Sequence, residues 1–254
     1  MVTEDLLNQI QKGREGKNWG LTMGLPKLER YVDGVAQGTY TLLFSGSGIG
    51  KTSLAVYSYM YRPIMDNLQD LSKLEILYIS LEMKPAILLA KLLSTYIFET
   101  YNRQISFKEM LSKTRGKLLS DEDYELIKKS TDWLQKVESV LTIYDKVLNE
   151  TEFYKLLKGV ADKNGTFTES ENRLIYTPND PDKVILIVID HLALCTPRTG
   201  NTLKNEMDAI SKIAVKFRNR CNFSTLMIMQ ANRESNNIER RKLELLEPQR
   251  SDVK

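Results

Sequence analysis

The stretch Phe44-Ser45-Gly46-Ser47-Gly48-Ile49-Gly50-Lys51-Thr52-Ser53 decides the fold of this chain. It follows the apolar run Tyr40–Phe44, which is typical of a buried strand, and it precedes Leu54–Tyr57, which is typical of the start of a helix. A glycine-rich turn in this setting lets consecutive backbone N–H groups converge in front of the helix N-terminus, and the resulting concavity binds phosphate. The stretch therefore predicts a phosphate-binding loop.

Two residues of this loop have specific expected roles. Lys51 reaches the β- and γ-phosphates of a nucleotide, and Thr52 places its hydroxyl on Mg²⁺. Ser45 stands where the strict pattern G-x-x-x-x-G-K-[ST] has glycine, so an ordinary Gly/Ser turn is the alternative. The strand before and the helix after favour the phosphate loop. The residues predicted to bind the nucleotide are Ser45, Gly46, Ser47, Gly48, Ile49, Gly50, Lys51, Thr52 and Ser53.

Composition sets broad limits on the kind of protein. The chain has 254 residues, 42% of them hydrophobic, which suffices for one large domain with a core. The net charge of +3 is too small to indicate a partner. Cys195 and Cys221 are too few for a disulfide framework, and the single histidine, His191, excludes a multi-histidine metal site. The absence of a membrane-spanning apolar run or a signal peptide predicts a cytoplasmic protein with no membrane partner.

Strands and helices are expected to alternate along most of the chain. The predicted strands are continuous apolar runs, as is usual for parallel strands covered on both faces. This alternation predicts an α/β fold with a mostly parallel sheet flanked by helices. The segment 163–183 departs from it and predicts a hairpin insertion on the surface. The predicted strands are Tyr40–Phe44, Glu75–Ser80, Val140–Tyr144, Val184–Ile189 and Ser224–Gln230.

Polar side chains end three of these apolar runs. Asp190 follows Val184–Ile189, the position at which a P-loop fold holds Mg²⁺, although an aspartate after a strand is also a common helix cap. Glu82 follows Glu75–Ser80 and either polarises the attacking water or favours the dipole of the next helix. Gln230 either senses the γ-phosphate or is a surface residue.

In this order, the motifs resemble those of one known family. Ser80-Leu81-Glu82-Met83, Ile189-Asp190-His191-Leu192 and Gln230-Ala231-Asn232-Arg233 are similar to segments of the RecA-like motor domain of DnaB-type replicative helicases. The lead-in Gly20–Gly38 is similar as well, and Ser-Leu-Glu-Met is the most discriminating of the four. His191 stands where the family often has an aromatic residue, and it is interpreted as a packing residue.

The resemblance implies a mechanism and partners. It makes ATP and Mg²⁺ the cofactors, Lys51 and Thr52 their ligands in the loop, Asp190 the metal ligand, Glu82 the catalytic base and Gln230 a catalytic residue that couples the γ-phosphate to a DNA-facing loop. It also implies single-stranded DNA as a partner, a homo-oligomeric hexameric ring with ATP sites between subunits, and interactions with a primase and a helicase loader.

The resemblance further divides the chain into two parts. Residues 1–20 correspond to a linker helix and linker, in which a helix from Thr3 to Lys12, stopped by Gly13, packs either on a neighbouring subunit or on its own domain. Residues 21–254 correspond to the ATPase core. Arg250 and Lys254 fall near the start of a DNA-contacting loop. The last strands and the arginine finger of the family are expected after Lys254, which suggests a fragment or a truncated gene of phage or mobile-element type.

Two other functions are compatible with these motifs. A RecA- or RadA-like recombinase uses the same phosphate chemistry in filaments, although Ser-Leu-Glu-Met argues against it. A nucleotide-binding module that hydrolyses little ATP and regulates a helicase is the third hypothesis.

Overall fold

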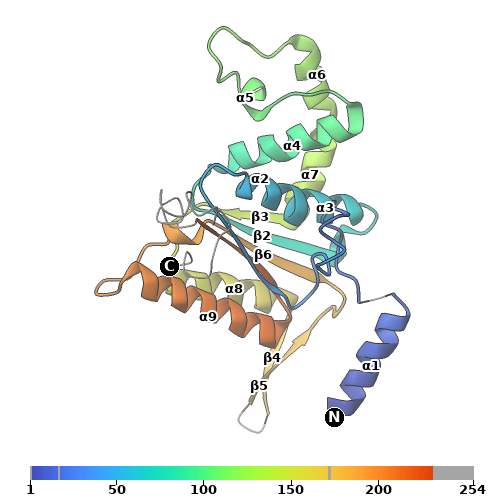
Figure 1. Ribbon diagram of the computed structural model, residues 1–254, viewed down its shortest axis with the longest axis vertical. Coiled ribbons are helices and arrows are strands. Elements are labelled where there is room, and N and C mark those ends of the chain that lie inside the picture. Colours follow the sequence, from blue (N-terminus) through green and yellow to red (C-terminus); the bar gives the residue numbers. More distant parts are fainter. Residues whose placement is uncertain (1, 17, 171–172, 231–254) are drawn as a thin grey trace, which may run out of the picture.

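The computed structural model describes residues 2–16, 18–170 and 173–230 (Figure 1). Its centre is a five-stranded sheet with the strand order β1-β7-β6-β2-β3, and every neighbouring pair is parallel. The strands are β1 (Tyr40–Ser45), β2 (Leu74–Ser80), β3 (Leu141–Tyr144), β6 (Val184–Asp190) and β7 (Ser224–Gln230). All five lie within one residue of their predicted bounds, and the predicted α/β class with a mostly parallel sheet is confirmed.

Helices cover both faces of this sheet, above and below it in Figure 1. Side chains alternate along a strand, so Ile76 and Tyr78 of β2 face one layer while Leu77 and Ile79 face the other. One layer consists of α2 (Lys51–Val56), the π-helical segment Tyr57–Tyr61, α3 (Arg62–Asp66), α4 (Pro85–Tyr101) and α7 (Thr131–Val140). The other consists of α8 (Glu150–Asn164) and α9 (Leu203–Cys221). Burial on both faces explains the continuous apolar character of the strands.

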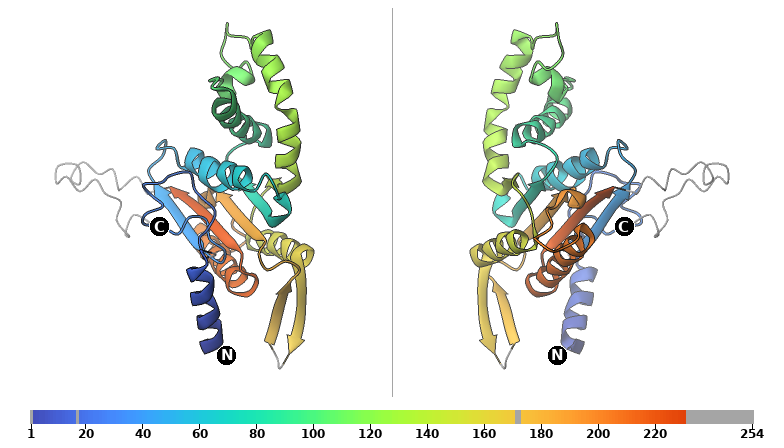
Figure 2. Two further views of the ribbon diagram at one scale, coloured as in Figure 1. Left: turned by 90° about the vertical axis from the view of Figure 1, so that its right-hand side faces the viewer. Right: turned by 90° about the vertical axis from the view of Figure 1, so that its left-hand side faces the viewer.

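A helical arm rises from one layer (Figures 1 and 2). It contains α4 and α7 together with the short helices α5 (Phe107–Met110) and α6 (Asp121–Lys129). Serine side chains cap both short helices, because the Ser106 and Ser120 hydroxyls accept hydrogen bonds from the backbone N–H groups of Glu109 and Asp123. Between α4 and α7, the rings of Tyr96 and Trp133 stack 4.2 Å apart and hold the arm together.

Two elements project from the opposite side of the sheet (Figure 2). One is an antiparallel hairpin of β4 (Gly165–Ser170) and β5 (Arg173–Pro178), in the stretch for which the sequence predicts a hairpin. The other is α1 (Val2–Arg14), which runs two residues past the predicted end at Lys12. Gly16, with φ of 71°, supplies the left-handed residue beyond the helix end, so the expectation that Gly13 stops the helix is wrong.

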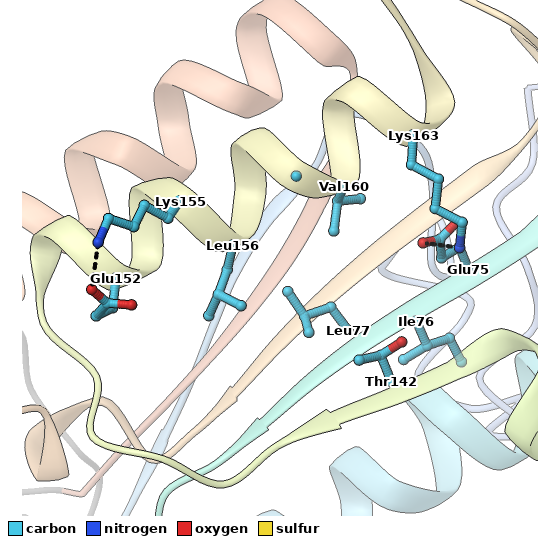
Figure 3. Close-up of a pocket in the computed structure, with 10 residues that line it drawn as sticks. Glu75, Ile76, Leu77, Thr142, Glu152, Lys155, Leu156, Val160 and Lys163 are labelled. Atoms are coloured by element: carbon cyan, nitrogen blue, oxygen red, sulfur yellow. Dashed lines mark hydrogen bonds and ion pairs between the residues drawn. The ribbon is translucent and has the colours of Figure 1, made fainter.

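The base of the hairpin is attached to the sheet through a buried carboxylate. Glu75 of β2 is only 7% exposed and accepts hydrogen bonds from Lys163 Nζ (2.9 Å), Lys183 Nζ (2.9 Å) and Asn164 Nδ2 (3.1 Å). Figure 3 shows the Lys163 contact at one end of a cavity of about 360 Å³ between α8 and strands β2 and β3. Burial alone raises the pKa of the Glu75 carboxyl, but these hydrogen bonds outweigh it and hold that pKa below its ordinary value.

This cluster makes the stability of the fold depend on pH. Because the pKa of Glu75 is lower in the folded chain, its stabilisation is complete above the ordinary value of 4.5 and is lost as the pH falls below it. We expect Glu75→Gln to lower the free energy of unfolding at pH 7 by roughly 1.5–3 kcal/mol, the usual contribution of a hydrogen bond to a charged group. The difference from the parent should shrink towards pH 3, as measured by urea unfolding.

Glu152 provides a matched control on the wall of the same cavity. It pairs with Lys155 at 2.9 Å, but its side chain is 40% exposed, so Glu152→Gln should change stability by less than about 0.5 kcal/mol. Equal effects of the two variants at pH 7 would contradict a special role for the buried carboxylate.

Candidate nucleotide-binding site

The predicted phosphate loop connects β1 to α2. β1 ends at Ser45, and α2 begins at Lys51 with Gly50 as its N-cap. Gly48 and Gly50 have φ angles of 78° and 97°, in the left-handed region that favours glycine. A Cβ at either position would meet no atom within 4 Å, so backbone conformation rather than space requires glycine there. Ser45 belongs to the extended strand, which explains why a serine is tolerated where the strict pattern has glycine.

The Lys51 side chain folds back over this loop. Its Nζ donates hydrogen bonds to the backbone carbonyls of Ser45 (2.9 Å) and Gly46 (2.6 Å). Burial lowers the pKa of the Lys51 ammonium, whereas the negative charges of Asp190 and Glu82 act in the opposite direction. The ammonium therefore lies within electrostatic reach of both predicted acidic residues.

The sheet brings the predicted site residues to one edge. In the parallel register, Ser45 of β1 is opposite Gln230 of β7, and Ser80 of β2 is opposite Asp190 of β6. The backbone N–H of Leu81 also donates to the carbonyl of Asp190 at 2.8 Å, which fixes the start of the segment that carries Glu82. The side chains of Glu82 and Gln230 are exposed, and both are therefore accessible to a bound molecule.

Asp190 differs from them because it is only 1% exposed. Its Oδ2 accepts a hydrogen bond of 2.8 Å from the hydroxyl of Tyr78, which lies on the neighbouring strand β2. Burial, followed by the charge of Asp190 and this hydrogen bond, raises the pKa of Tyr78 well above its ordinary value, so the phenol stays protonated and donates. Tyr78 lies outside the motifs that were recognisable in the sequence. Its place two residues before the end of a strand was the only signal.

The residues at this edge fit Mg²⁺ and a nucleotide. Within the described ranges, no group of three or more His, Cys, Asp or Glu residues could hold a metal ion. Mg²⁺ needs no such group, because it commonly binds one or two protein ligands together with substrate phosphates. Thr52, in the first turn of α2, and Asp190 match that donor set. The glycine-rich loop and the Lys51 ammonium match the phosphates.

The remaining residues singled out in the sequence are either buried or outside the described part of the chain. His191 is buried at 7% exposure, and its Nδ1 has no hydrogen-bond partner in the described part of the chain. Cys195 and Cys221 are buried free thiols, and burial raises the pKa of each to about 11, as expected for core residues. Arg250 and Lys254, predicted to contact DNA, lie outside the described residues.

A parallel sheet with a glycine-rich loop between its first strand and the following helix, and acidic residues at the same edge, is typical of a P-loop ATPase domain of the RecA-like class. The chain belongs to the family described as the DnaB-like helicase C-terminal domain, whose model matches residues 20–254. It is therefore a DnaB-like helicase ATPase domain.

Solved structures show the same fold. A structure described as an ATPase domain superposes with a TM-score of 0.73 at 16% identity, covering 100% of this chain and 78% of that one. A DnaB-like replicative helicase, described with its interactions with primase, gives a TM-score of 0.70 at 17% identity. That match covers 99% of this chain and 52% of the helicase chain, so this chain spans about half of that protein. The comparison with curated proteins yields no match.

Among the described residues, none of the helices has the length and apolar character needed to cross a membrane.

Proposed function

We propose that this chain is an ATP-driven motor that hydrolyses ATP and translocates on single-stranded DNA as part of a replicative helicase. The observation that carries the proposal is the convergence of the phosphate loop, Asp190, Glu82 and Gln230 at one edge of the sheet, in a chain of the DnaB-like family. The family match also favours this function over a recombinase. No feature of the described residues specifically favours a regulatory module.

Each residue has a role in the proposed reaction. The loop N–H groups and Lys51 hold the β- and γ-phosphates, and the Thr52 hydroxyl and Asp190 carboxylate hold Mg²⁺. When bound, the metal neutralises charge that develops on the transferred phosphoryl group. Glu82 is free to accept a proton from the attacking water on a carboxylate oxygen, because its side chain is exposed. Gln230 extends from β7 beside the phosphate loop and links the γ-phosphate to the segment that follows it.

The proposal includes assembly into a homo-oligomeric, hexameric ring. The apolar side chains of α1, Leu6, Leu7 and Ile10, are 56%, 59% and 50% exposed, so half or more of each is left uncovered by its own domain. This agrees with the first of the two expectations for the helix, contact with a neighbouring subunit. A primase and a loader are further proposed partners, and the structural neighbour described with primase supports the first of them.

The test is ATP turnover with and without single-stranded DNA, measured in an assembly competent for turnover. We expect hydrolysis that requires Mg²⁺ and becomes faster when an unstructured oligonucleotide is added, measured as released phosphate. Asp190→Asn serves as the inactive reference, because an amide replaces the metal-binding carboxylate. Mg²⁺-dependent ATP binding with no DNA effect on turnover would contradict the motor and favour a regulatory module. Absence of nucleotide binding would contradict the site itself.

A further inference from the structure

Tyr78 and Asp190 form a buried pair between neighbouring strands. In the register of β2 and β6, Tyr78 is opposite Val188 and Ser80 is opposite Asp190, so Tyr78 and Asp190 are offset by two residues on the same face of the sheet. Tyr78 is 0% exposed and Asp190 is 1% exposed. The 2.8 Å hydrogen bond between them is therefore shielded from water, where such bonds are strongest.

The bond restrains the orientation of the carboxylate. The terminal torsion of an aspartate is broad, so a carboxylate with no fixed partner rotates among several orientations. A donor on Oδ2 removes much of that freedom and leaves lone pairs on the carboxylate for another ligand. The groups around a metal ligand commonly orient it in this way.

The chemical type of the donor also matters. A lysine or arginine at this position would neutralise Asp190 and compete electrostatically with a divalent cation. The phenol of Tyr78 is a neutral donor, so it fixes the position of Asp190 without placing a second positive charge beside a bound cation. If Tyr78 only filled the core, any nearby acceptor would satisfy its hydroxyl. Instead the hydroxyl donates to the residue that is proposed to bind the metal.

We propose that Tyr78 is a positioning residue for the metal: its hydroxyl holds the Asp190 carboxylate in the orientation that receives Mg²⁺ of a bound nucleotide. The inference rests on the proposed function, because it takes Asp190 as a metal ligand. Tyr78 stands outside the sequence motifs that carry the other site residues. The side chain of Tyr78 acts through Asp190 and does not itself contact the metal.

The experiment is a Mg²⁺ titration of the protein bound to a fluorescent N-methylanthraniloyl derivative of ADP. Tyr78→Phe keeps the ring in the core and removes the hydroxyl alone. We expect its apparent Mg²⁺ dissociation constant to rise about 10- to 100-fold, the usual effect of losing a partner of a metal ligand. Binding of the nucleotide without metal should change less than about twofold. Raising the Mg²⁺ concentration should restore full nucleotide binding in Tyr78→Phe. Added Mg²⁺ would not restore binding if the variant had a general packing defect.

Tyr61→Phe is the matched control. Tyr61 is also 0% exposed, and its hydroxyl also donates to a carboxylate, Glu99 Oε2, at 3.1 Å, but that pair lies between the π-helical segment and the arm helix α4. The apparent Mg²⁺ dissociation constant of Tyr61→Phe should equal that of the parent. If Tyr78→Phe does not fold, Tyr78→Met replaces it, because methionine adapts to gaps in a core.

A double-mutant cycle shows whether Tyr78 acts through Asp190. In an Asp190→Asn background, adding Tyr78→Phe should cause no further loss of metal affinity. An equal loss in both backgrounds, or an unchanged Mg²⁺ constant in Tyr78→Phe, would overturn the inference. A parent protein that binds the nucleotide with no Mg²⁺ dependence would instead overturn the proposed metal site, so the two failures are distinguishable.

Discussion

Lys51→Ala is expected to abolish measurable binding of Mg·ATP while leaving the fold intact. The ammonium lies over the loop and is held by two backbone carbonyls, so it is in place to act on the triphosphate. A ligand that binds only the native state stabilises it by about 2.7 kcal/mol at 100 times its dissociation constant. For a chain of this size, that corresponds to several degrees in melting temperature. The parent should show this shift with ATP, and the variant should show none.

Lys91→Ala is the control for this measurement. Lys91 is likewise half-buried, but it belongs to α4, where its ammonium lies 5.4 Å from the centre of the Phe107 ring. Loss of the Lys91 side chain can lower the melting temperature of the protein without ATP. Added ATP should nevertheless raise the melting temperature of Lys91→Ala by as much as it does in the parent. Equal ATP stabilisation of the parent and Lys51→Ala would refute the assignment of the loop.

Glu82→Gln is expected to lower kcat by roughly 10²- to 10⁴-fold, the usual contribution of a positioned general base. The amide keeps the shape of the side chain but no longer accepts a proton from water. Nucleotide affinity should hardly change, because Lys51 and the loop carry it. The measurements are steady-state phosphate release and an independent ATP titration, both in an assembly competent for turnover.

Glu138→Gln, an exposed glutamate on α7, should leave both quantities unchanged. The base assignment predicts a loss in rate per bound ATP. If Glu82→Gln weakened ATP binding and kept the same rate per bound ATP, Glu82 would serve the structure of the segment after β2 instead.

The sequence was sufficient to locate the strands and to place most of the candidate residues at one edge of the sheet, because these signals are local. A parallel strand covered on both faces has a continuous apolar run, and a phosphate loop needs its glycines within a few positions. Strand ends of a parallel sheet share one edge, so Ser45, Asp190 and Gln230 were predictable as neighbours of that edge. Their roles in binding and catalysis remain predictions.

The contacts that depend on strand order were not predictable. The Tyr78–Asp190 pair needs β2 and β6 side by side in a particular register, and apolar runs do not encode either. From the sequence, Glu75 was expected only as the first residue of a strand. Its partners Lys163 and Lys183 come 88 and 108 positions later, so the cluster could not be predicted from local sequence. The predicted end of α1 was wrong for a local reason, because a helix tolerates a glycine such as Gly13 at a cost of about 1 kcal/mol.

The two buried cysteines make this chain suitable for site-specific labelling. With thiol pKa values raised by burial to about 11, Cys195 and Cys221 carry much less thiolate at neutral pH than ordinary thiols, and burial also shields them from maleimide dyes. An introduced cysteine at Leu118, whose side chain is 87% exposed on the arm, would react selectively in the otherwise unaltered protein. A second one at exposed Glu169 of the hairpin would allow energy-transfer measurements between the arm and the hairpin during nucleotide turnover.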